Sequence, residues 1–178
     1  MWIVLIIVLV VLLLVWIITT SNRLNRTIVK IDEADAGIDV ALTKRYDALT
    51  KLIEVVKGYA KHEKETLFEV VTLREGMTME EKNKANHIMS ENLHKAEFLV
   101  EEYPDLKASQ NYLDLQMTIV DVEEHLQAAR RLYNSNISTF NQMIVTFPTS
   151  IIAKAKGLVK KAFFEADEEK KKDVEIKF

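Results

Sequence analysis

The chain contains no cysteine, and it has only four glycines and two prolines among its 178 residues. The absence of cysteine excludes disulfides, thiolate catalysis and thiolate metal sites. Because glycine and proline interrupt regular structure, a chain so poor in both and rich in Leu, Ala, Glu and Lys is expected to be all-α. Glycine-rich phosphate loops and a serine in a nucleophile elbow are also missing. We therefore predict a protein that is not an enzyme and needs no cofactor.

The charges are nearly balanced, with 24 lysines and arginines against 27 aspartates and glutamates and a formal net charge of -3. Such a balance produces no overall basic field that would attract a polyanion. We therefore expect no nucleic-acid partner.

One long apolar run, Met1 to Ile18, opens the chain without a charge, a proline or a glycine. As a helix that rises 1.5 Å per residue, it is about long enough to cross roughly 30 Å of hydrocarbon. Trp2 and Trp16 lie near its two ends, where amphipathic rings favour the headgroup layer. A cleaved secretory signal is the alternative, but it would need positive charge before the apolar core and small residues at a cleavage site. Residues 1–21 are predicted to be a retained transmembrane anchor in the lipid bilayer.

Positive charges follow the apolar run at Arg23, Arg26 and Lys30, and none precedes it. By the positive-inside rule, this distribution leaves the short N-terminus outside and the remainder in the cytoplasm. We predict a single-pass protein of the cell membrane, with a helical bundle over residues 22–165 and a charged C-terminal tail over residues 166–178.

Four further stretches carry apolar residues in steps of three and four, which is the spacing of one helix face. These stretches are 22–60, 63–75, 79–102 and 112–147. The first could continue the anchor as a single rod. Thr78 followed by Glu81 is a capping box at the start of the third, and Pro148 ends the fourth.

Residues 63–102 together span about the same length as each of the two long stretches. We therefore predict an antiparallel up-and-down bundle of three long arms, with the middle arm kinked at Gly76 and a shorter helix over about 150–165. A full reversal of the chain at Gly76 is the alternative. It would return the long helix around Ile119 toward the membrane.

The predicted short helix is amphipathic, with apolar residues on one arc and lysines on the other. The candidate surface-contact residues are Ile151, Ile152, Lys154, Leu158, Lys160 and Lys161. A basic amphipathic helix can lie on an anionic inner leaflet. The three-arm layout, however, starts this helix at the far end of the bundle. We therefore favour packing against the bundle, with membrane or partner contact as the alternative.

His87, Glu91 and His94 share one helix face, and Glu91 with His94 forms a Glu-x-x-His pair of the kind used in di-iron bundles. A di-iron bundle needs two such pairs, and no second pair occurs in the sequence. We predict a plain surface and no metal site here.

The string IDVALTKRYDALTKLIEVVKGYAKHEKET, which begins at Ile38, resembles the signature of the bacterial LemA family. Further matching pieces follow in the same order at residues 103–108, 111–116, 129–134, 147–148 and 163–165. The resemblance implies a single-pass membrane protein with a cytoplasmic helical bundle and no established reaction. It also points toward a scaffold or adaptor, because some relatives are associated with membrane-bound zinc proteases and others with specialised membrane compartments.

We therefore predict a membrane-anchored helical scaffold or adaptor that organises partner proteins at the inner face of the cell membrane. A membrane protease and a second copy of the chain are the candidate partners. The alternative functions are a metal-carboxylate bundle enzyme and a protein that remodels the membrane surface through its basic C-terminal helix.

Overall fold

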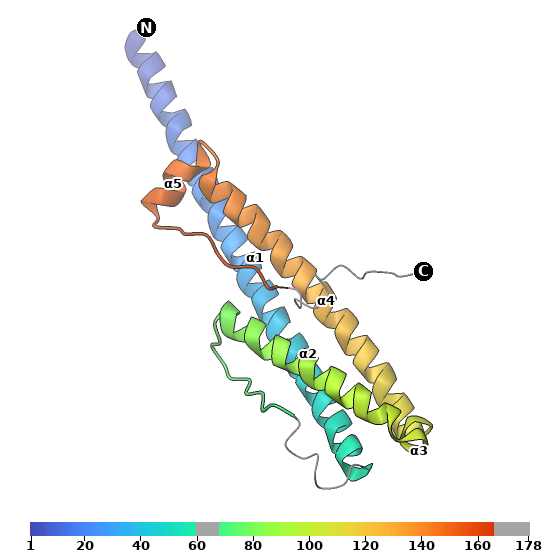
Figure 1. Cartoon of the computed structure of the whole chain (residues 1–178). Helices are drawn as coiled ribbons and strands as arrows, with labels where there is room; N and C mark the ends of the chain where they lie inside the picture. Colours follow the sequence, from blue (N-terminus) through green and yellow to red (C-terminus); the bar gives the residue numbers. More distant parts are fainter. Residues whose placement is uncertain (60–67, 166–178) are drawn as a thin grey trace, which may run out of the picture. The chain divides into compact units, whose positions relative to one another are not determined.

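The computed structural model describes residues 1–59 and 68–165. These residues form five helices and no strand, so the predicted all-α class is confirmed (Figure 1). The helices are α1 (Trp2–Tyr59), α2 (Met79–Glu101), α3 (Pro104–Lys107), α4 (Gln110–Val145) and α5 (Thr149–Ala155). The predicted charged tail, 166–178, lies outside the described residues.

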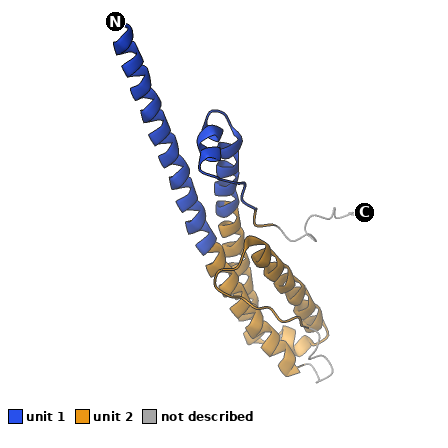
Figure 2. Ribbon diagram, turned by 90° about the vertical axis from the view of Figure 1, so that its left-hand side faces the viewer, with its two compact units in different colours: residues 1–36, 132–162 blue, residues 37–131, 163–178 orange. Residues whose placement is uncertain are grey.

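The chain divides into two compact units, which Figure 2 colours separately. Unit 1 comprises Met1–Ala36 and Leu132–Ala162. Unit 2 comprises Gly37–Arg131 and Phe163–Phe178. The long helices α1 and α4 each contribute one part to each unit, so each unit has its own core.

The apolar run forms the first part of α1, and the helix continues through Ser21 and Asn22 without a break. The expectation of a single rod is therefore confirmed. An 18-residue window of this helix has a mean hydropathy of 3.3, and none of that window is buried. By length and composition, this segment can cross a membrane.

Unit 1 is built on an antiparallel pair of helices. Thr27 Oγ1 on α1 lies 3.7 Å from Met143 Sδ on α4, and Asn136 Nδ2 on α4 donates to the backbone oxygen of Lys30 at 3.0 Å. Residue numbers fall along α4 as they rise along α1, so the two helices run in opposite directions here. Phe140 of α4 is among the fully buried side chains of this core.

Unit 2 contains a helix pair with the opposite relation. Lys82 Nζ on α2 lies 2.7 Å from Asp39 Oδ1 on α1, and Arg45 of α1 donates to Ser90 Oγ of α2 at 2.9 Å. Residue numbers rise together along the two helices, so α2 runs parallel to this part of α1. The predicted antiparallel arrangement of these two arms is therefore wrong.

The segment that precedes α2 explains why α2 runs parallel to α1. The described part of the helix predicted over 63–75 is not helical. Asn92 of α2 holds this segment, because Glu69 N–H donates to Asn92 Oδ1 at 3.0 Å and Asn92 Nδ2 donates to Glu69 O at 2.7 Å. One side-chain amide thus satisfies both backbone groups of a residue that forms no helix.

Gly76, with a left-handed φ of 76°, lies in the turn that leads into α2. Glu69 lies against Asn92 and Arg74 against Glu81, so the chain reverses at this turn. The predicted kink is therefore wrong, and the alternative of a full reversal is confirmed, with α4 running back along α1 in unit 1.

α2 begins at the predicted capping box. Glu81 N–H donates to Thr78 Oγ1 at 3.3 Å, and Thr78 N–H donates to Glu81 Oε2 at 2.8 Å. Bonds from the backbone and side chain of Thr78, with a further bond from Arg74, hold the pKa of Glu81 below its usual value. Hydrogen bonds to the charged form of a carboxyl group have this effect.

The helix predicted over about 150–165 is wrong beyond Ala155, where α5 ends. Gly157 has a left-handed φ of 66°, its N–H donates to Lys154 O at 3.0 Å, and Leu158 N–H donates to Ala153 O at 3.0 Å. This pair of bonds is a Schellman motif, which closes a helix at a glycine.

The chain after α5 continues without helical structure to Glu165. In unit 1, Asn141 Nδ2 donates to Lys161 O at 3.0 Å and Lys161 N–H donates to Asn141 Oδ1 at 3.0 Å. In unit 2, Asn83 Nδ2 donates to Phe163 O at 3.3 Å and Glu165 N–H donates to Asn83 Oδ1 at 3.0 Å. The side chains of Asn141 and Asn83 therefore hold this segment in place. Asn92 holds the segment before α2 in the same way.

Candidate functional site

All five residues predicted to set the membrane position lie on α1 within unit 1. Trp2 is exposed and Trp16 is half-buried. Arg23, Arg26 and Lys30 are exposed, so their charged groups lie outside the core of the unit. The structure is thus compatible with cationic side chains that face lipid headgroups just beyond the apolar segment.

The six predicted surface-contact residues have different environments. Ile151 and Lys154 on α5 are exposed, whereas Ile152 is buried in the core of unit 1. In the segment that follows, Leu158 is half-buried, while Lys160 and Lys161 are exposed. The amphipathic helix that was expected to join these residues ends before Leu158.

The histidines considered as metal ligands lie on the exposed surface of α2. His87 Nε2 is 3.4 Å from Glu91 Oε1, one helical turn away, and His94 Nδ1 is 3.6 Å from Glu97 Oε2. Among residues 1–59 and 68–165, no group of three or more His, Cys, Asp or Glu side chains is placed to hold a metal ion.

A buried polar network in unit 2 positions the three helical segments of that unit. The guanidinium of Arg45 on α1 donates through Nε to Glu123 Oε1 on α4 at 2.6 Å. Through Nη1 it donates to the backbone oxygen and to Oδ1 of Asn86 on α2, at 2.9 and 2.6 Å, and through Nη2 to Ser90 Oγ. One planar side chain therefore bonds to both neighbouring helices, which fixes their register with α1.

A second buried cation supports the same register. Lys82 has a side chain that is almost fully buried, and its Nζ bonds to the exposed Asp39. The aliphatic stem of a lysine can pack in a core while its ammonium group reaches a partner at the rim. This network has a structural role, because its charged and polar side chains bond to one another.

The outward face of α4 in unit 2 has the opposite character. Leu113, Met117 and Val120 are 42%, 65% and 56% exposed, and their spacing of four and three places them on one stripe of the helix. We call these three residues the α4 ridge. Sequence reasoning missed the ridge because it followed the other apolar stripe of this helix, through Tyr112 and Val122, which packs in the core. The sequence does contain the signal for the ridge, as a second apolar stripe that starts at Leu113, one residue after Tyr112.

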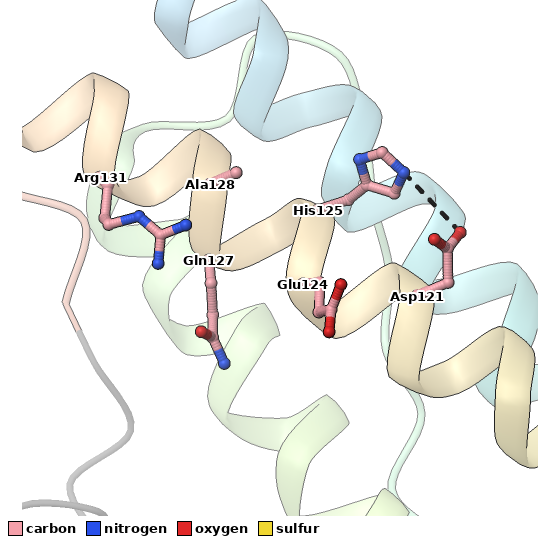
Figure 3. A pocket seen from close by; sticks show the side chains of 6 residues that line it. All are labelled: Asp121, Glu124, His125, Gln127, Ala128 and Arg131. Carbon is pink, nitrogen blue, oxygen red and sulfur yellow. Dashed lines mark ion pairs between the residues drawn. The ribbon is translucent and has the colours of Figure 1, made fainter.

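A shallow hollow lies beside the ridge, and its lining residues come from one helix (Figure 3). They are Asp121, Glu124, His125, Gln127, Ala128 and Arg131. His125 Nε2 is 3.7 Å from Asp121 Oδ2, and both side chains are largely exposed. Figure 3 shows this pair on one side of the helix, with Gln127 and Arg131 extending to the other. The lining contains charged groups and an imidazole, and none of its side chains carries a hydroxyl or a thiol.

These features define an all-α protein with a membrane-length apolar segment in its first helix and a helical bundle that carries an exposed apolar stripe on α4. The model of the LemA family matches residues 34–178. The chain is 31% identical over 160 residues to Protein LemA of Metamycoplasma hominis, across 87% of this chain and 73% of that protein. This chain belongs to the LemA family, as the sequence motifs indicated.

A shorter similarity joins the chain to Magnetosome protein MamQ of Magnetospirillum gryphiswaldense. The two are 26% identical over 66 residues, which cover 37% of this chain and 24% of that protein.

Proposed function

We propose that this chain is a membrane-anchored scaffold or adaptor that binds a partner protein through the α4 ridge and the acidic positions beside it. The observation that carries the proposal is the exposure of Leu113, Met117 and Val120 on one stripe of α4, outside the apolar segment of α1. Exposed apolar stripes with a polar border are typical of protein interaction surfaces.

The anchor is the apolar segment of α1, which crosses the cell membrane in this proposal. The helical bundle then lies at the inner face of that membrane. The support is the mean hydropathy of 3.3 in that segment and the exposed cations Arg23, Arg26 and Lys30 that follow it. Cations in such positions favour the cytoplasmic side. In this orientation, unit 2 and the part of unit 1 beyond the apolar segment face the cytoplasm.

The chemistry of the α4 face suggests the kind of partner. Apolar residues spaced by four and three match the anchors of an amphipathic helix that packs lengthwise. Asp121 and Glu124 border the ridge, so a partner helix with basic residues at the matching end would have charge complementarity. A membrane protease or a second copy of the chain could present such a helix. The role requires no bond-making step, because binding and position are its output.

Photo-crosslinking in intact membranes tests the proposal. A photoreactive amino acid at Met117 or Val120 is expected to give a protein adduct on illumination, and the same group at Lys84, an exposed position on α2, is the matched control. An adduct of twice the chain mass would identify a second copy as the partner, and mass spectrometry would identify any other protein. Equal adduct yields at Lys84 and at the ridge, or no adduct at the ridge, would overturn the proposal.

The acidic border has its own test. Glu124→Lys reverses a charge beside the ridge without removing any apolar contact, and it is expected to lower the adduct yield at Val120. Lys84→Glu reverses a charge at a distant exposed position and is expected to leave that yield unchanged. A yield that is insensitive to Glu124→Lys would exclude a basic partner surface.

A further inference from the structure

Unit 1 carries a second group of exposed apolar side chains where α4 meets α5. We call residues 146–151 the α4–α5 corner. Within it, Phe147 is 78% exposed and Ile151 is 56% exposed. Phenylalanine and isoleucine are usually buried. The exposure of Phe147 and Ile151 at one corner therefore indicates that the corner contacts another apolar surface.

The register of unit 1 gives the level of this corner along α1. Thr27 lies opposite Met143 in the antiparallel pair, so Phe147, four residues further along α4, lies at about the level of Arg23. An independent contact agrees, because Lys156 Nζ donates to Asn25 Oδ1 at 2.8 Å. Figure 2 shows the corner beside α1 within unit 1.

Arg23 comes three residues after Thr20, which is about 4.5 Å along the helix axis at 1.5 Å per residue. The packed face of α1 also starts at this level, since Trp16 and Thr20 are half-buried and Leu24 is fully buried. The exposed ring of Phe147 therefore lies where the apolar segment of α1 ends. In a protein anchored by that segment, this level is the interface between hydrocarbon and headgroups.

Exposed cations surround the same level. Arg23 and Arg26 lie on α1, Lys154 lies on α5, and Lys156 follows it. An apolar tip with adjacent lysines and arginines is the pattern of side chains that bind an anionic membrane surface.

The register also separates these lysines from the others in the segment. Lys161 Nζ lies 3.9 Å from Asp32 Oδ1, and Asp32 comes twelve residues after Thr20, or about 18 Å further from the apolar segment. Lys161 is therefore too far along α1 to share the interface with Phe147.

We propose that the α4–α5 corner is a second membrane contact. Phe147 and Ile151 enter the interfacial layer beside the anchor, and Lys154 with Arg23 and Arg26 binds anionic lipid headgroups. The inference rests on the proposed membrane anchoring of α1 and adds a second attachment point. Two points of attachment restrict the tilt and rotation of unit 1 against the bilayer, which one helix alone leaves free.

The absence of cysteine makes a direct test possible, because one introduced cysteine gives one labelled site. Full-length chains with Phe147→Cys or Ile151→Cys carry a nitroxide label and are reconstituted into vesicles of phosphatidylcholine and phosphatidylglycerol. Collisions with oxygen report lipid burial, and collisions with a water-soluble nickel complex report exposure to water. Val8→Cys in the apolar segment and Lys84→Cys on the exposed surface of α2 serve as the lipid and water references.

Labels at positions 147 and 151 are expected to respond more to oxygen than to nickel, as at position 8, whereas position 84 responds more to nickel. If position 8 lies in lipid but 147 and 151 resemble 84, the second contact is wrong and the anchor stands. If position 8 also responds as an aqueous site, the anchoring proposal fails as well.

The headgroup part of the inference has a separate outcome. Omitting phosphatidylglycerol, or adding Lys154→Glu to the Ile151→Cys chain, is expected to increase nickel accessibility at position 151. Lys44→Glu in the same chain is the control, since Lys44 is an exposed residue of unit 2. Unchanged accessibility without anionic lipid would overturn the assignment of headgroup binding to these cations.

Discussion

Arg45 offers the sharpest test of how unit 2 is held together. Its guanidinium makes four hydrogen bonds, to Glu123, to two oxygens of Asn86, and to Ser90. Arg45→Met keeps most of the aliphatic stem and removes every one of these bonds. The variant thus separates the polar network from the packing of the stem.

Removing one partner of a buried ion pair typically costs about 3–5 kcal/mol of unfolding free energy, because the other charge is left without compensation. The side chain of Glu123 is 22% exposed, so water can solvate part of its carboxylate in the variant. We therefore expect the lower end of this range, about 3 kcal/mol. Adding Glu123→Leu removes the orphaned carboxylate and is expected to restore part of the loss, since an apolar pair can replace a buried ion pair.

Urea unfolding of the full-length chain in detergent micelles, followed by circular dichroism, measures the effect. With a slope of about 2 kcal/mol per molar urea, a loss of 3 kcal/mol lowers the midpoint by about 1.5 M. Lys44→Met removes an exposed cation from the preceding position of α1 and is expected to change stability by less than about 0.5 kcal/mol. If Arg45→Met lowers the midpoint no more than Lys44→Met does, the network does not stabilise unit 2.

Two further predictions concern unit 1. Burial, together with the nearby Asp35 and Asp32, raises the pKa of Tyr133 from 10.0 to about 12. Its neutral hydroxyl donates to Ala162 O at 3.2 Å. Because the folded state favours the neutral hydroxyl, Tyr133 stabilises the fold below pH 10 and loses this contribution as the pH rises toward 12. Tyr133→Phe is expected to reduce this alkaline fall in unfolding free energy, and an identical pH profile for the variant would contradict the assignment. Arg23→Glu combined with Arg26→Glu is expected to give chains of mixed orientation, measured as protease accessibility of the C-terminal tail from outside the membrane, with Lys44→Glu as the control. Unchanged protection of the tail would show that these arginines do not set the topology.

The long helices could be predicted from sequence because their signals are local. Apolar steps of three and four indicated α1 and α4, and the Thr78 and Glu81 pair indicated the start of α2 within the same turn of chain. Each of these signals depends on residues that remain neighbours along one helix, so no knowledge of the tertiary structure is needed to recognise it.

The non-helical segments could not be predicted in this way. Residues 68–75 have apolar spacing that is compatible with a helix, but the hydrogen bonds of Glu69 come from Asn92, which is 23 positions away. Arg45 was not singled out for the same reason, because its partner Glu123 lies 78 positions away. Gly157 was a local signal that periodicity overlooked, since a glycine at the C′ position ends a helix whatever apolar pattern follows it.

The end of α5 at Ala155, which the Schellman motif at Gly157 closes, also explains why the candidate membrane contact lies at the corner and not along an amphipathic helix. After the Schellman motif, the chain runs past Asn25 and then past Asp32, as the contacts of Lys156 and Lys161 with these residues show. It therefore moves away from the apolar segment of α1 with each residue. Asn141 fixes this direction by bonding both backbone groups of Lys161. Phe147 precedes this turn and is consequently left exposed at the level where the anchor ends. A substitution at Asn141 that freed the segment around Lys161 would therefore leave the level of Phe147 along α1 unchanged.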